Sequence, residues 1–120
     1  MSDNPSDAIV VFMTAANREQ AARIAEMLVG THLAACVQIM SGIESVYRWQ
    51  GKIERAIETL LIAKTVASKF EELEREVRAL HSYETPEIVA VPIIAGSAAY
   101  LEWLFASTEQ LAASGGRPPS

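Results

Sequence analysis

The stretch His81-Ser-Tyr-Glu-Thr-Pro-Glu87 holds the densest group of side-chain types that bind metals. An imidazole beside carboxylates suits a divalent cation, and histidine binds copper well. No helical or strand spacing forces these groups together, so a solvated loop, or hydrogen bonds between subunits, is favoured over a metal site. The candidate metal ligand here is His81, and the candidate ligand-binding or inter-subunit residues are Tyr83, Glu84 and Glu87.

Cys36 is the only cysteine and offers a second kind of metal chemistry. As a thiolate it would be a soft ligand for copper, which makes it the other candidate metal residue. Free cysteines are among the most buried residue types, and Cys36 stands in an apolar run, so a core thiol is the favoured interpretation. A single cysteine allows neither a disulfide within the chain nor a multi-cysteine zinc site, and it agrees with a reducing compartment. Further thiols could come near only if several chains associate.

The sequence offers no convincing catalytic set. Glu84 and Glu87 would need unlike environments to act as acid and base in hydrolysis, and the sequence shows none. It also contains no serine-histidine-aspartate set, no glycine-rich phosphate loop and no two-cysteine redox motif. We therefore expect no enzymatic activity and no obligatory cofactor.

A third group of candidate residues surrounds a predicted hairpin turn at Trp49-Gln-Gly-Lys52. Gly51 supplies the positive φ that a two-residue turn needs, and the flanking residues are rich in β-branched and aromatic types. Pairing outward from the turn predicts three cross-strand pairs: Trp49 with Lys52, Tyr47 with Glu54, and Val37 with Lys64. Gly42 is predicted to form a bulge or bend in the first arm.

This hairpin is long for a protein of this size. Its arms, within residues 34–65, have roughly fifteen residues each and would reach about 50 Å at ~3.3 Å per residue. A compact chain of 120 residues has a diameter of about 35 Å. The tip should therefore overhang its own domain and expose apolar side chains, which another subunit would cover. Tyr47, Trp49 and Lys52 are therefore candidate inter-subunit or ligand-binding residues, with Trp49 as an interface anchor.

Hydrophobic patterning predicts the elements that position these groups. Residues 8–14 form a continuous apolar run, which is typical of a central strand. Asn17 is the predicted cap of a first helix, with Gln20 in the capping-box position, and Gly30 is its predicted stop. A second helix is predicted from Ser68, where Ser-Lys-Phe-Glu forms another capping box.

The last predicted elements are a strand over residues 88–95 and a helix over residues 98–108. Pro92 has no N–H to donate, so this strand should lie at an edge of the sheet. The resulting β-α-β-β-α-β order favours an α+β fold, a ferredoxin-like sandwich with helices on one face and the first and third strands central. Residues 8–108 are predicted to form one domain, between a flexible N-terminus at 1–7 and a flexible C-terminal tail at 109–120.

Composition and charge narrow the function classes. Half of the 120 residues are hydrophobic, which indicates a globular protein. The net charge of −5 and the lack of a basic stripe argue against nucleic-acid binding. No apolar run approaches the ~20 residues of a membrane helix, and the N-terminal residues do not read as a signal peptide. We therefore expect a cytoplasmic protein that contacts neither nucleic acid nor membrane.

Five motifs together resemble the CutA-type divalent-cation tolerance family, over residues 9–107. They are Leu33-Ala-Ala-Cys-Val37, Tyr47-Arg-Trp-Gln-Gly-Lys52, Glu58 with Ile62-Ala-Lys-Thr65, His81-Ser-Tyr-Glu-Thr-Pro-Glu87 and Tyr100-Leu-Glu-Trp-Leu104. The resemblance implies a ferredoxin-like subunit, a tight homotrimer similar to the PII signalling proteins, a cytoplasmic location, and tolerance to copper or other divalent cations. Family members proposed to hold copper often have a cysteine where this chain has Met13. The usual proline after the loop histidine is Ser82 here.

The favoured interpretation is a homotrimeric, non-enzymatic divalent-cation tolerance protein that binds copper or another divalent metal. The alternative is a PII-like signalling or scaffold trimer that binds a small metabolite in a cleft between subunits. In the most specific form of this prediction, Trp49 and Lys52 of one subunit lie over the His81 loop of another.

Overall fold

The computed structural model describes residues 7–109. The predicted flexible N-terminus (1–7) and C-terminal tail (109–120) lie outside this range except for Asp7 and Glu109. The elements follow the predicted order: β1 (Ala8–Ala15), α1 (Arg18–Gly30), β2 (Cys36–Trp49), β3 (Lys52–Val66), the 3₁₀ turn η1 (Ala67–Lys69), α2 (Phe70–Leu80), β4 (Ile88–Pro92) and α3 (Ala98–Ser107). Within residues 7–109, none of the helices is long and apolar enough to cross a membrane.

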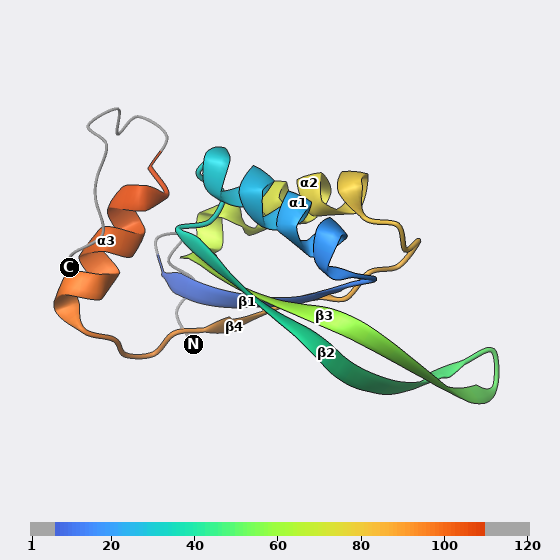
Figure 1. The fold of residues 1–120 in the computed structure, drawn as a ribbon. Helices are drawn as coiled ribbons and strands as arrows, with labels where there is room; N and C mark the ends of the chain where they lie inside the picture. Colours follow the sequence, from blue (N-terminus) through green and yellow to red (C-terminus); the bar gives the residue numbers. More distant parts are fainter. Residues whose placement is uncertain (1–6, 110–120) are drawn as a thin grey trace.

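The four strands form one antiparallel sheet in the order β2-β3-β1-β4. This confirms the predicted fold, with β1 and β3 central and Pro92 on an edge strand. Helices α1 and α2 cover one face of the sheet, and α3 lies at one end of it (Figure 1). The core lies between the sheet and the helices. Its fully buried large side chains include Val11, Met13 and Leu61 from the strands and Ile24, Leu28, Leu73 and Val77 from the helices.

The first helix begins as predicted. Asn17 Oδ1 accepts a hydrogen bond of 2.8 Å from the backbone N–H of Gln20, and the helix ends at Gly30. The Gln20 side chain does not bond back to Asn17 but accepts a bond of 3.1 Å from the N–H of Ala16.

The predicted start of the second helix at Ser68 is wrong. Ser68 lies inside η1, and α2 begins at Phe70 without a side-chain cap. A residue that caps a helix must have a non-helical backbone. Here Val66, at the end of β3, has the extended backbone, and Ser68 already lies inside the 3₁₀ turn, so it cannot act as the cap. The N–H of Ala67 instead bonds to the Asp7 carbonyl oxygen at 2.8 Å.

The last strand is shorter than predicted. Its ladder ends at Pro92, and the next residue, Ile93, donates to the carbonyl oxygen of Ala8 at 3.0 Å. Ala8 is the first residue of β1, which pairs with β4, so within residues 7–109 the ladder has no partner for residues beyond Ile93.

The hairpin has the predicted turn. Gln50 and Gly51 have φ values of 51° and 78°, the pair of positive values that a type I′ turn needs. Trp49 faces Lys52, and Tyr47 faces Glu54, as predicted.

Beyond the bulge at Gly42 the predicted pairing is wrong by one residue. The register shifts between Met40 and Ile43, because β2 has one more residue than β3 there. As a result Val37 faces Ala63, and Cys36 faces Lys64. Gly42 itself has a φ of 83°, as the extra residue in a bulge often requires.

The hairpin extends beyond the rest of the domain (Figure 1), and the largest dimension of the described chain, with the hairpin included, is 48 Å. Its apolar side chains are open to solvent: Trp49 is 57% exposed, Ile53 68% and Ile57 66%. The predicted overhang is thus present in the isolated chain.

Candidate functional site

His81 directly follows α2 and connects the next loop to the end of β1. Its Nε2 lies 2.6 Å from the carbonyl oxygen of Thr14, and its Nδ1 lies 3.0 Å from the backbone nitrogen of Tyr83. Because the N–H of Tyr83 donates to Nδ1, the ring proton belongs on Nε2, which donates to Thr14. Both ring nitrogens are therefore engaged within the chain.

Tyr83 extends this arrangement to the hairpin. Its hydroxyl donates a hydrogen bond of 2.8 Å to Glu58 Oε2, and its ring centroid lies 4.6 Å from that of His81. Burial, followed by the hydrogen bond and the charge of Glu58, raises the pKa of Tyr83 to about 12. The phenol thus stays protonated as a donor to a carboxylate that is only 9% exposed.

The predicted hairpin residues lie on the same side of the hairpin as Glu58. Cross-strand partners share a side, and so do residues two apart along a strand. The pairs Ile43 with Glu58, Tyr47 with Glu54, and Trp49 with Lys52 therefore form one continuous row. Tyr47 is close enough to Tyr83 to contribute to the rise in its pKa. This row runs from the root of the hairpin, where Ile43 faces Glu58, to the exposed tip.

Glu58 lies at the centre of this cluster but is not among the predicted site residues. A signal was available, because counting outward from the turn places Glu58 on the side of Tyr47 and Trp49. A carboxylate next to Thr59 and Leu60, where the second arm becomes apolar, also suggested a buried acceptor.

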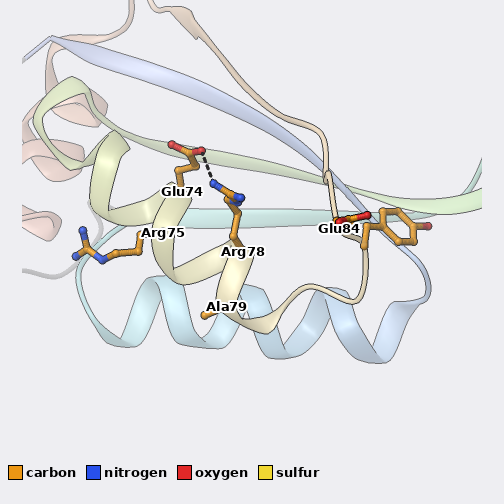
Figure 2. A pocket seen from close by; sticks show the side chains of 6 residues that line it. Glu74, Arg75, Arg78, Ala79 and Glu84 are labelled. Atoms are coloured by element: carbon orange, nitrogen blue, oxygen red, sulfur yellow. Dashed lines mark ion pairs between the residues drawn. The ribbon is translucent and has the colours of Figure 1, made fainter.

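An open groove of about 460 Å³ lies on the other side of Tyr83, between α2 and the loop. Its walls are formed by Glu74, Arg75, Arg78, Ala79, Tyr83 and Glu84. Figure 2 shows Arg78 on the helix paired with Glu74, and Glu84 on the loop. Glu87 is exposed and lies outside this group, just before β4.

Cys36 occupies a different part of the molecule. It is half-buried at the start of β2, and its Sγ lies 3.4 Å from the hydroxyl of Tyr100 on α3. Burial, followed by the contact with Cys36, raises the pKa of Tyr100 to about 12.

A single chain does not bring Cys36 and His81 together. Cys36 faces Lys64, whereas Thr14, which accepts from His81, faces Leu60. Four residues along a strand correspond to about 13 Å. Met13 is fully buried in the core. Among residues 7–109 no three histidine, cysteine or acidic side chains come together as a metal-holding group.

Comparisons with known proteins identify the family. The family described as CutA1 divalent ion tolerance protein matches residues 9–107. The divalent-cation tolerance protein CutA of Thermus thermophilus is 48% identical over 99 residues, which cover 82% of this chain and 96% of that protein. The chloroplastic CutA of Arabidopsis thaliana is 51% identical over 83% of this chain but only 55% of its own length.

Solved structures show the same fold. The divalent cation tolerance protein from Thermus thermophilus superposes with a TM-score of 0.84 at 46% identity, covering 85% of this chain and 99% of that one. CutA1 from Oryza sativa superposes with a TM-score of 0.85 at 45% identity, covering 88% of this chain and 97% of that one. The family match spans most of the sequence, and the sheet, hairpin and helices agree with it. The chain therefore belongs to the CutA1 divalent ion tolerance family.

Proposed function

We propose that this chain acts as a homotrimeric, non-enzymatic divalent-cation tolerance protein of the cytoplasm, which binds copper or another divalent metal. The observation that carries the assembly is the exposed apolar hairpin. A two-stranded ribbon with Trp49, Ile53 and Ile57 in water is marginal by itself, so a covering partner would stabilise it.

The sheet offers a second surface for other copies. Val11 and Met13 are buried against the helices, so Val10 and Phe12, which alternate with them, lie on the opposite face. Val89 and Val91 of β4 face Phe12 and Val10 and are about half exposed. The hairpin of one copy could contact the sheet of the next, which would be a head-to-tail contact between unlike surfaces. Such contacts close into a ring when the rotation between neighbouring subunits brings the last copy back to the first.

Cys36 and His81 are the proposed metal ligands, and they differ in how freely each can bind a metal ion. Cys36 faces Lys64, which faces Val10, so it lies on the open face of the sheet, where further copies could add ligands. A thiolate there would favour copper over harder ions. His81 could bind a metal only by giving up its bond to Thr14 or to Tyr83.

Copper titration of the purified protein, followed by calorimetry, tests direct metal binding. We expect Cys36→Ser to lower the affinity by at least about tenfold, because the only thiol of the chain is removed. His81→Ala should lower it less, and His32→Ala serves as a histidine control distant from the His81 loop. Unchanged stoichiometry and affinity in both Cys36→Ser and His81→Ala would remove these residues from any metal site.

A second candidate function is a PII-like signalling or scaffold trimer that binds a small metabolite between subunits. It is favoured by the half-buried Tyr83–Glu58 pair, which shares a side of the hairpin with exposed Trp49 and Lys52. Titration with small anionic metabolites separates the two functions. Binding that depends on Lys52 but not on Cys36 supports the second, and copper binding that depends on Cys36 supports the first.

A further inference from the structure

The groove between α2 and the His81 loop has the features of a small-ligand site. Its volume of about 460 Å³ lies within the range of small-molecule pockets. Arg75 and Arg78 come from α2, three residues apart and therefore neighbours on the helix surface. Glu84 comes from the loop, so the groove has charged groups on both walls (Figure 2). Ala79 and the ring of Tyr83 add an apolar surface.

The charged groups of the groove are incompletely paired within the chain. Arg78 Nη1 lies 3.6 Å from Glu74 Oε2, and Arg75 Nε lies 3.9 Å from Glu76 Oε2, with all four side chains well exposed. Exposed ion pairs of this kind contribute little to the stability of the fold. They also leave most of the five N–H donors of each guanidinium group free to bind a ligand. Among residues 7–109 Glu84 makes no ion pair and no side-chain hydrogen bond, although it is exposed and lines the same groove as Arg75 and Arg78.

The positions of the arginines and glutamates in the groove indicate which charges a ligand should carry. A guanidinium binds a carboxylate in a two-point geometry, whereas a carboxylate such as Glu84 binds an ammonium group. Two arginines and two glutamates line the groove, so a multiply charged anion such as phosphate would be repelled by Glu74 and Glu84. A molecule with one charge of each sign is complementary to both walls.

We propose that this groove binds a small zwitterion of the amino-acid class, with its carboxylate on Arg78, its ammonium group on Glu84 and its side chain against Ala79 and Tyr83. The inference rests on the small-metabolite binding proposed above as the second candidate function, in which Tyr83 takes part. Unlike the inter-subunit cleft, the groove is complete within one chain. Because Tyr83 also donates to Glu58, a bound zwitterion would contact a residue that reaches the hairpin root.

Calorimetric titration of the full chain with L-alanine, acetate and methylammonium chloride tests this proposal, with the amide resonances of Tyr83 and Glu84 as a second measurement. We expect saturable binding of L-alanine and at least about tenfold weaker binding of either singly charged compound. Arg78→Gln and Glu84→Gln should each weaken L-alanine binding by about tenfold. Glu71→Gln, on the same helix but outside the groove, should leave it unchanged.

Three results would overturn the proposal: no saturable L-alanine binding, equal binding of acetate, or unchanged binding in both groove variants. Light scattering and copper titration on the same variants keep this test separate from the proposed function. If L-alanine does not bind while assembly and copper binding persist, the zwitterion site falls and the proposed function stands. If L-alanine binds but the protein neither assembles nor binds copper, the zwitterion site stands and the proposed homotrimeric metal-binding function falls.

Discussion

The hydroxyl of Tyr83 donates a hydrogen bond of 2.8 Å to Glu58 Oε2 and so links the loop after α2 to the root of the hairpin. This hydrogen bond joins two residues that are 25 positions apart in the chain. The loop contributes one wall of the groove, and the hairpin carries the exposed apolar side chains, so this hydrogen bond connects the two proposed surfaces.

Tyr83→Phe should destabilise the protein by about 1–3 kcal/mol, because it leaves the mostly buried Glu58 carboxylate without its donor. Chemical unfolding of both proteins measures the difference. Tyr47→Phe is the matched control, since no hydrogen bond of the Tyr47 hydroxyl is present among residues 7–109. An equal loss in the two variants would show that the Glu58 bond contributes nothing specific.

Alkaline pH should weaken the fold between pH 10 and about 12. The folded pKa of Tyr83 and that of Tyr100 are raised from 10.0 to about 12, so the folded chain holds these protons more tightly than the unfolded chain. Their contribution to stability is complete below pH 10 and is lost as the pH rises toward 12. Unfolding free energies measured across this range should fall with pH in the wild type and fall less steeply in Tyr83→Phe and in Tyr100→Phe. An identical slope in all three proteins would contradict the assignment.

His81→Ala should loosen the loop without unfolding the domain. The substitution removes the bonds to Thr14 and Tyr83, so the backbone N–H of Tyr83 loses its acceptor. Hydrogen exchange at the Tyr83 amide should become faster by about tenfold or more, as expected for the loss of one hydrogen bond of about 1.4 kcal/mol. His32→Ala removes a bond to the Ser107 carbonyl oxygen instead and should leave this amide unchanged. Unaltered exchange in His81→Ala would mean that other contacts hold the loop.

Two glycine-to-alanine substitutions should change the stability of the protein in opposite directions. Gly42 has a φ of 83°, so Gly42→Ala should cost about 1–2 kcal/mol through backbone strain alone. Gly30, at the end of α1, has a negative φ and open space around its Cβ position, so Gly30→Ala should stabilise by about 0.5–1 kcal/mol. Thermal unfolding of both variants measures this contrast, and destabilisation by Gly30→Ala would refute the argument from φ.

The sequence predicted the features that depend on local patterns. Apolar periodicity indicated the element order, Pro92 indicated the edge strand, and Gly51 with its neighbours indicated the turn and the overhang. The predicted pairing of Val37 is wrong by one residue because the extra residue in the bulge at Gly42 shifts the register of all pairs beyond it. The error at Ser68 arose because a capping motif does not show where the preceding strand ends.

The candidate site was less predictable because its contacts join distant segments. The loop residues were identified by type, but the bonds from His81 to Thr14 and from Tyr83 to Glu58 depend on how the loop passes the ends of β1 and β3. For the same reason the sequence could not show that Cys36 and His81 lie at different places along the sheet.

Mass measurement by light scattering tests the central claim, that the hairpin is covered by other copies of the chain. At low micromolar concentration we expect a species with three times the chain mass of 13.0 kDa. Trp49→Ala, which removes an exposed apolar anchor at the tip, should shift this species toward monomer with unchanged secondary structure. Arg23→Ala, an exposed change on α1, should not shift it. A wild-type mass of one chain, or an intact trimer of Trp49→Ala, would contradict the account.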